Sequence, residues 1–226
     1  MRPLVVNTFL TLDGVMQAPG GPEEDPIGGF AHGGWSVPYW DDAMAESMGE
    51  VMTPPFDLLL GRKTYEIFAA HWPHTDEPGA AELNAATKYV ASRTLDAVEW
   101  ENSVLLEGDV PEAVAELKRG DGPEIQVHGS ADLLQTLLRH DLVDRFRLLV
   151  FPVVLGSGKR LFGDGAIPRG LRMVETATSS TGVVMSIYEP AGDVEVGTFA
   201  LETPTAAEVE RRERAMAETD SQRSDP

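Results

Sequence analysis

Apolar and polar residues alternate along the chain in blocks that predict strands separated by helices. Residues 4–12 form an apolar run typical of a buried strand, and Asp13 with Gly14 is typical of the turn that ends it. Further short apolar runs predict strands at 57–61, 88–91, 104–106, 125–128 and 145–154. Their lengths and boundaries are those of strands in a sheet that is covered on both faces.

Apolar residues spaced three or four positions apart predict helices between these strands. Met44, Met48 and Met52 share one face of a predicted helix over residues 41–52, and Asp109 begins another through a capping box. The remaining helices are predicted from residue 62 onward, over 80–87, and after Ser130. Such alternation of strand and helix predicts an α/β fold with a mainly parallel central sheet between two helical layers.

The pattern changes to consecutive strands after residue 145. Residues 172–178 and 183–188 predict an antiparallel hairpin at one edge of the mixed sheet, and residues 194–201 predict a last short strand. From residue 203 the chain is rich in Glu, Arg and Ala without a clear apolar stripe. We therefore expect one domain over residues 1–202 and an acidic, mostly disordered tail over 203–226, with room for a frayed helix.

A segment over residues 17–36 is too long and too rich in glycine and proline for a simple turn. Long loops in compact domains are usually either functional lids or disordered. This one ends in a cluster of large aromatic residues, Trp35, Tyr39 and Trp40, which favours a lid.

Composition limits the chemistry that the chain can perform. It contains no cysteine, which excludes disulfides and thiolate sites, and its five histidines show no metal-binding spacing. We expect exposed histidines and no metal site. The formal net charge of −19 disfavours nucleic acids and anionic membranes, and no apolar run approaches the roughly 20 residues of a membrane helix. No secretory pattern is visible at the N-terminus, so we expect a cytoplasmic protein that acts on a small molecule.

Three turns that directly follow predicted strands carry groups suited to binding phosphate. Gly61 to Thr64 combine a glycine turn, two cations and a hydroxyl at a helix start. Ser92, Arg93 and Thr94 offer a guanidinium beside hydroxyls, which suits a phosphate monoester. Gly129, Ser130 and Ala131 place small residues before a helix, although Ser130 also fits a simple helix cap. A Gly-x-Gly-x-x-Gly motif does not follow the first strand, so an ordinary dinucleotide fold of that type is not indicated.

The order of these motifs resembles the dihydrofolate-reductase-like superfamily. The resemblance spans about residues 3 to 190 and is carried by Leu12-Asp13-Gly14, Gly61-Arg62-Lys63-Thr64-Tyr65-Glu66, Ser92-Arg93-Thr94, Val127-His128-Gly129-Ser130 and the segment Phe151 to Phe162. It is strongest to the reductase domain of the riboflavin-biosynthesis deaminase-reductase. It implies a three-layer fold and NADPH as the cofactor. The deaminase half has no counterpart in this chain.

The resemblance also implies roles for particular residues. The cofactor-binding residues would be Gly61, Arg62, Thr64, Ser92, Arg93, Thr94, Gly129, Ser130, Ala131 and Gly156. Arg62 and Thr64 would meet phosphates, and Ser92 and Arg93 would favour the 2′-phosphate of NADPH. Trp35, Lys159 and Arg160 would lie at the substrate, with either cation receiving a phosphate or staying solvated.

Three carboxylates are candidate catalytic groups. Asp41 or Asp42 follows an aromatic segment similar to the one that carries the pterin-binding acid of dihydrofolate reductase, but with an extra residue, so a helix cap fits equally well. Asp13 could orient the substrate or relay a proton, and a turn cap is an equal alternative.

The resemblance implies hydride transfer to a small heterocyclic or ribosylamino-pyrimidine substrate. The alternatives are a dihydrofolate or pterin reductase and a non-catalytic nucleotide-binding protein of the same fold. Because the late antiparallel strands offer an exposed edge, we also expect a homodimer.

Overall fold

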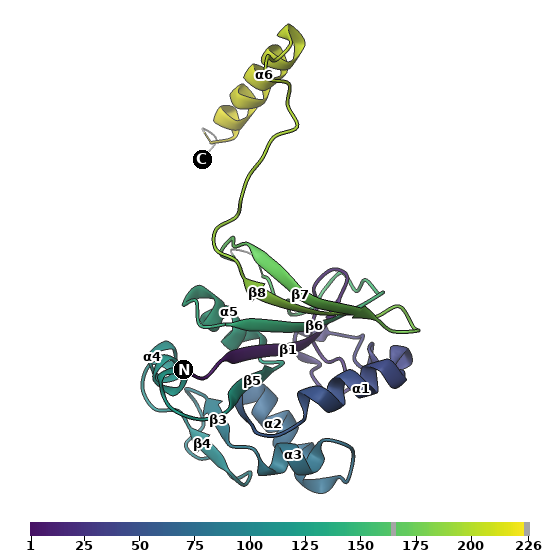
Figure 1. Cartoon of the computed structure of the whole chain (residues 1–226), viewed down its shortest axis with the longest axis vertical. Helices are drawn as coiled ribbons and strands as arrows, with labels where there is room; N and C mark the ends of the chain where they lie inside the picture. Colours follow the sequence, from purple (N-terminus) through teal and green to yellow (C-terminus); the bar gives the residue numbers. More distant parts are fainter. Residues whose placement is uncertain (164–165, 224–226) are drawn as a thin grey trace. The chain divides into compact units, whose positions relative to one another are not determined.

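The computed structural model describes residues 1–163 and 166–223, with the side chains of the last five of these left out. Its regular elements alternate as the sequence predicts (Figure 1). The strands are β1 (Leu4–Thr11), β2 (Phe56–Gly61), β3 (Lys88–Ala91), β4 (Ser103–Leu105), β5 (Glu124–His128), β6 (Arg145–Phe151), β7 (Leu171–Thr178) and β8 (Val184–Pro190). The helices are α1 (Asp42–Val51), α2 (Arg62–His71), α3 (Ala80–Ala85), α4 (Val110–Arg119), α5 (Ala131–Arg139) and α6 (Ala206–Arg223), with short 3-10 turns η1 (Ile27–Gly29), η2 (Val37–Tyr39) and η3 (Trp72–His74).

The strands form one eight-stranded sheet in the order β4-β3-β2-β5-β1-β6-β8-β7. The first six strands of that order pair in parallel, whereas β8 pairs antiparallel to both β6 and β7. The predicted mixed sheet with an antiparallel C-terminal edge is therefore confirmed.

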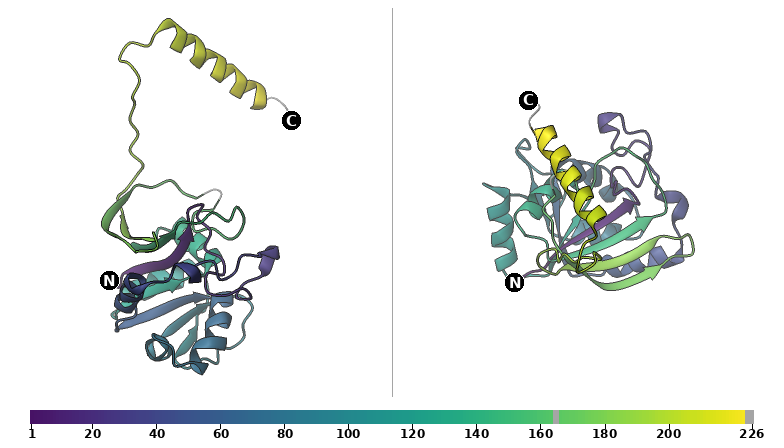
Figure 2. Two further views of the ribbon diagram at one scale, coloured as in Figure 1. Left: turned by 90° about the vertical axis from the view of Figure 1, so that its right-hand side faces the viewer. Right: turned by 90° about the horizontal axis from the view of Figure 1, so that it is seen from above.

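Helices cover both faces of the sheet, which Figure 2 shows from two further directions. On one face, Leu133, Leu134 and Leu137 of α5 pack against Val6 and Val127 of the central strands. The opposite face carries two smaller apolar clusters, one around α2 and α3 and the other around α1 and the loop after β1. Because both faces of β1 and β2 are buried, these strands consist mostly of apolar residues.

The loop over residues 17–36 is tied to itself by side chains that bond to backbone carbonyls. Gln17 Nε2 donates to the carbonyls of Asp25 and Ile27 at 2.9 Å, and Trp35 Nε1 donates to the carbonyl of Gln17 at 2.8 Å. Gly33 lies so close to Gly21 that a Cβ there would sit 2.4 Å from its carbonyl oxygen. The loop is thus locally ordered, and its role as a lid stays a prediction.

The chain forms two compact units, one over Met1–Asp193 and one that begins at Val194. The expected boundary after residue 202 stays a prediction. The predicted strand over 194–201 is wrong, because this segment has no regular structure. The tail expected from residue 203 contains the helix α6, for which the sequence left room. Its helical form without an apolar stripe is supported by ion pairs such as Glu208 with Arg212 and Glu210 with Arg214. Across residues 1–163 and 166–223, none of the helices combines the length and apolar character that crossing a membrane requires.

Candidate functional site

A cleft of about 2200 Å³ opens in the first unit where the parallel strands end. It is lined by the segments that follow β1, β2, β3 and β5, by α1, and by one face of β6, β7 and β8. Ligands of open α/β sheets bind at this carboxyl edge, because the loops that leave the strands converge there. The three phosphate-type turns predicted from the sequence all line this one cleft.

Two of these turns are bonded to each other. The backbone N–H of Gly61 donates to Ser130 Oγ at 3.0 Å, and the backbone N–H of Ser130 donates to Thr64 Oγ1 at 3.0 Å. Gly129 has a φ of 57°, and a Cβ at this position would lie 3.3 Å from Thr64 Oγ1. The close approach of the two turns therefore depends on a glycine. Ser130 occupies the N-cap position but makes no side-chain cap to α5, since its hydroxyl bonds across to β2 and to the carbonyl of His128.

The N-termini of α2 and α5 carry no side-chain caps, unlike those of α1 and α4. Asp41 caps α1 by accepting from the N–H of Met44, and Asp109 caps α4 by accepting from the N–H of Glu112. Within the described residues, the first-turn N–H groups of α2 and α5 have no such partner. Both helices begin in the lining of the cleft, so donors and the positive ends of two helix dipoles meet there. This arrangement can hold the paired phosphates of a dinucleotide.

The third turn presents a free guanidinium. Ser92 Oγ accepts from the N–H groups of Thr94 and Leu95 at 3.1 and 3.0 Å, which fixes the bend. Arg93 is exposed at its tip and makes no hydrogen bond or ion pair with any residue that the structure describes. Arg62, by contrast, pairs with Glu66 one helical turn away at 3.0 Å. These placements are compatible with the predicted cofactor roles of Ser92, Arg93, Thr94 and Arg62, which stay predictions.

Asp13 joins the end of β1 to the loop after β6. Its Oδ1 accepts from Thr11 Oγ1 at 2.6 Å, and Oδ2 accepts from the N–H of Gly156 at 2.8 Å. The bond from Thr11 and two from backbone N–H groups outweigh the opposing effect of burial and lower the pKa of Asp13 to about 2. Asp13 is thus a carboxylate at neutral pH, and it is absent from the cleft lining. The geometry favours the turn-capping alternative over the proton relay.

Asp41 also has structural partners. Besides capping α1, its Oδ2 accepts from the N–H and Oγ of Ser180 in the β7–β8 turn at 2.8 and 2.7 Å. The hydroxyl of Ser180 and the N–H of Met44 lower the pKa of Asp41. Asp42 is exposed in the first turn of α1, and neither aspartate is part of the cleft lining. Their catalytic roles stay predictions, with the helix-cap alternative observed for Asp41.

The candidate substrate residues are spread over the loops around the cleft. Trp35 is buried and packs edge-on against Phe151 at 5.1 Å between ring centroids. Lys159 lines the cleft but pairs with Asp25. Arg160 donates to the carbonyls of Asp13 and Gly156 at 2.9 and 3.0 Å. Of these three residues, the cleft lining contains only Lys159. Gly156, predicted to bind the cofactor, is also absent from the lining.

Polar residues on the strands themselves were missed by the sequence analysis. Asn7 of β1, His128 of β5 and Arg147 of β6 all line the floor of the cleft. The expectation that the histidines are exposed is wrong for His128, which is 8% exposed. Burial and the nearby charge of Arg147 lower its pKa to about 4 despite the opposing charge of Glu124. The sequence signal that could have identified such a residue is a polar side chain within an otherwise apolar run, as at Asn7.

Comparisons with known proteins agree with this architecture. The sequence pattern of the family described as the RibD C-terminal domain matches residues 2–185. Protein YyaP of Bacillus subtilis (strain 168), described as uncharacterized, is 30% identical over 83% of this chain and 94% of its own length. Protein YwjB of the same organism, also described as uncharacterized, is 30% identical over 53% of this chain and 65% of its own length.

Solved structures show the same fold at lower identity. A putative riboflavin biosynthesis protein from Shewanella sp. PV-4 superposes with a TM-score of 0.59 at 18% identity, over 84% of this chain and 99% of that one. A pyrimidine reductase-like protein from Corynebacterium diphtheriae superposes with a TM-score of 0.57 at 14% identity, over 85% of this chain and 93% of that one. Dihydrofolate reductase from Enterococcus faecalis, complexed with NADP(H), superposes with a TM-score of 0.51 at 16% identity, over 83% of this chain and 96% of that one. The fold is therefore that of the dihydrofolate-reductase-like superfamily.

Proposed function

Because the chain belongs to the RibD C-terminal domain family, we propose that it is an NADPH-dependent reductase of a small heterocyclic or ribosylamino-pyrimidine compound. When bound, NADPH supplies a hydride from carbon 4 of its nicotinamide to an electrophilic carbon of the substrate. The chain's residues hold the cofactor along the carboxyl edge of the sheet and orient the substrate beside it. The walls of the cleft exclude water from the reacting atoms.

The observation that carries the proposal is the pair of uncapped helix N-termini in one cleft. The turns before α2 and α5 are fixed to each other through Gly61, Thr64 and Ser130, so their free N–H groups converge. In a protein with a formal net charge of −19, such a cluster of donors is the local feature that an anionic cofactor requires. The turn at Ser92 and Arg93 lines the same cleft, and its exposed guanidinium suits a terminal phosphate.

A fluorescence titration of NADPH and NADH tests the cofactor assignment. We expect the wild-type chain to bind NADPH tighter than NADH by roughly tenfold or more, and Arg93→Ala to lose most of that preference. Arg119→Ala is the matched control, because Arg119 is an exposed arginine outside the cleft lining whose partner is Glu116. An unchanged preference in Arg93→Ala would show that this arginine does not contact the 2′-phosphate.

Turnover separates the reductase from the alternatives. Oxidation of NADPH in the presence of a ribosylamino-pyrimidine supports the proposed reaction. Faster oxidation with dihydrofolate would instead indicate a pterin reductase. Tight binding without oxidation by any heterocycle would indicate a nucleotide-binding protein that has lost catalysis.

A further inference from the structure

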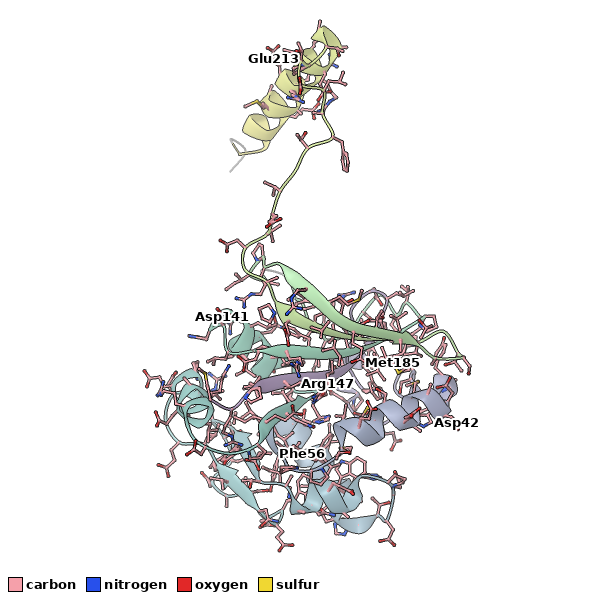
Figure 3. The ribbon with its side chains drawn as sticks, viewed as in Figure 1. Asp42, Phe56, Asp141, Arg147, Met185 and Glu213 are labelled. Atoms are coloured by element: carbon pink, nitrogen blue, oxygen red, sulfur yellow. The ribbon has the colours of Figure 1, made fainter. Side chains whose placement is uncertain are left out.

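Three polar residues form a row across the floor of the cleft. In the parallel pairing, Asn7 of β1 lies opposite His128 of β5 and also opposite Arg147 of β6. Residues in register on neighbouring strands point to the same face of a sheet, and all three line the cleft. Arg147 is labelled in Figure 3, on the strand next to β1. The row continues through Ile187 of β8 to Glu175 of β7.

Asn7 is the buried member of this row whose side-chain polar atoms have no partner among the described residues. Its side chain is 6% exposed, and neither Oδ1 nor Nδ2 makes a hydrogen bond with any described residue. Buried polar atoms are nearly always paired, because leaving them unpaired destabilises the fold. Among the described side chains, Ser103 Oγ on the distant edge strand β4 is the other buried atom of this kind. An unpaired carboxamide at the floor of this cleft therefore requires an explanation.

The neighbours of Asn7 already have partners. Arg147 makes two hydrogen bonds to the carboxylate of Glu124, at 2.7 and 3.2 Å. Gln126 Nε2 donates to the carbonyl of Val51 and to Glu124, so its Oε1 accepts from His128 Nε2 at 2.9 Å. The charge of Arg147 is thus balanced locally. Among the groups of this row, the Asn7 amide keeps both its donor and its acceptor unused.

The next row on the same face of the sheet, two residues further along β1, is apolar. Phe9 lies opposite Leu149, Leu149 opposite Met185, and Met185 opposite Ala177. All four line the cleft, and the ring of Trp40 lies 6.2 Å from that of Phe9. Met185 is labelled in Figure 3. Together these side chains offer a surface on which a flat ring can lie.

We propose that Asn7 selects the substrate by pairing its carboxamide with a lactam edge, an adjacent ring N–H and C=O, of an uncharged heterocycle that lies on Phe9, Leu149 and Met185. A carboxamide presents one donor and one acceptor in a plane, which matches such an edge with two hydrogen bonds. This assignment rests on the proposed function, since it concerns the substrate of the same cleft. An anionic group is disfavoured at this floor, because Arg147 is neutralised by Glu124 and Glu175 adds a carboxylate to the row. The amide atoms are covered in this structure, so the pairing requires that neighbouring side chains at the floor move aside when the ring enters.

Two probes test the pairing on the full chain, both without cofactor and in the presence of NADP⁺. 6-Aminouracil has lactam edges, whereas 6-amino-1,3-dimethyluracil has the same ring without a ring N–H. Ligand-detected NMR gives the ratio of their dissociation constants. We expect the wild-type chain to favour 6-aminouracil by roughly tenfold or more, and Asn7→Leu to reduce the ratio below about threefold. Asn7→Ser is a second variant, which keeps a polar group but cannot make two bonds, and it should also reduce the ratio below about threefold.

Ser103→Ala is the matched control, because it removes the other unpaired buried polar atom without touching the cleft. It should leave the ratio of the two probes unchanged. Without ligand, Asn7→Leu should raise Tm, since it replaces an unpaired amide by an apolar side chain of similar shape. A fall in Tm would overturn the idea that the amide is unpaired in the free protein, and would indicate a structural role for it.

The assignment is also overturned if the wild-type chain binds both probes equally, if it binds neither, or if Asn7→Leu keeps the wild-type ratio. These outcomes differ from failure of the reductase proposal. A chain that discriminates the probes through Asn7 but does not bind NADPH would refute the cofactor and keep the substrate class. If the chain oxidises NADPH but Asn7→Leu still discriminates between the two probes, the role of Asn7 is refuted and the reductase proposal stands.

Discussion

The backbone N–H of Gly61 donates to Ser130 Oγ at 3.0 Å, which ties the turn before α2 to the turn before α5 across 69 residues of sequence. This bond uses the serine hydroxyl that would otherwise cap α5. The first-turn N–H groups of both helices are left available to a ligand in the same cleft. A position that looks like an ordinary helix cap in sequence thus aligns two helix N-termini that carry no side-chain cap.

Gly129→Ala tests how closely the two turns must approach. Gly129 has a φ of 57°, where a residue with a Cβ is strained by about 1–2 kcal/mol, and the new methyl group would press on Thr64 Oγ1. We expect NADPH affinity to fall by about tenfold, and Tm to fall by several degrees. Fluorescence titration and thermal unfolding measure the two effects.

Gly120→Ala is a control for this substitution. Gly120 ends α4 with a φ of −68° and lies outside the cleft lining, so alanine fits its backbone. Its NADPH affinity should equal that of the wild-type chain. Wild-type affinity in Gly129→Ala as well would contradict the assignment of this turn to the cofactor.

Local sequence patterns predicted most of the fold. The apolar run at Lys88–Ala91 matched β3, and the hairpin expected over 172–178 and 183–188 became β7 and β8 with small shifts of their ends. These elements are recognisable because turn residues bound them and their periodicity is local. For α6 the sequence left room only for a frayed helix, since its ion pairs leave no apolar stripe to detect.

The candidate site was harder to predict, because its floor depends on strand register. Asn7, His128 and Arg147 meet only because β1 pairs with β5 on one side and with β6 on the other. Nothing in a single sequence specifies that pairing across more than a hundred residues. Asp13 was predicted as a catalytic candidate with turn capping as an equal alternative, and the structure places two backbone donors at its carboxylate.

Asp13→Ala distinguishes a structural role from proton transfer. We expect the loop after β6 to loosen, because the N–H groups of Leu155 and Gly156 lose their acceptor. The expected loss of stability is about 1–2 kcal/mol, with Asp13→Asn intermediate. Amide hydrogen exchange at residues 155 and 156 and thermal unfolding give the answer. A proton relay would instead predict a large drop in kcat while exchange and Tm stay unchanged.

His128 should make stability depend on pH in a window set by its burial. Burial and the charge of Arg147 lower its pKa from 6.5 to about 4, so the unfolded chain binds a proton between these values and the folded chain does not. Stability should therefore fall as pH drops from about 6.5 to about 4, by up to about 3 kcal/mol from this group. Urea unfolding at several pH values measures the slope of the free energy of unfolding against pH. His128→Gln should have a smaller slope than the wild-type chain, whereas His74→Gln, at an exposed site, should keep it. Equal slopes in all three proteins would show that His128 titrates alike in the folded and unfolded chain.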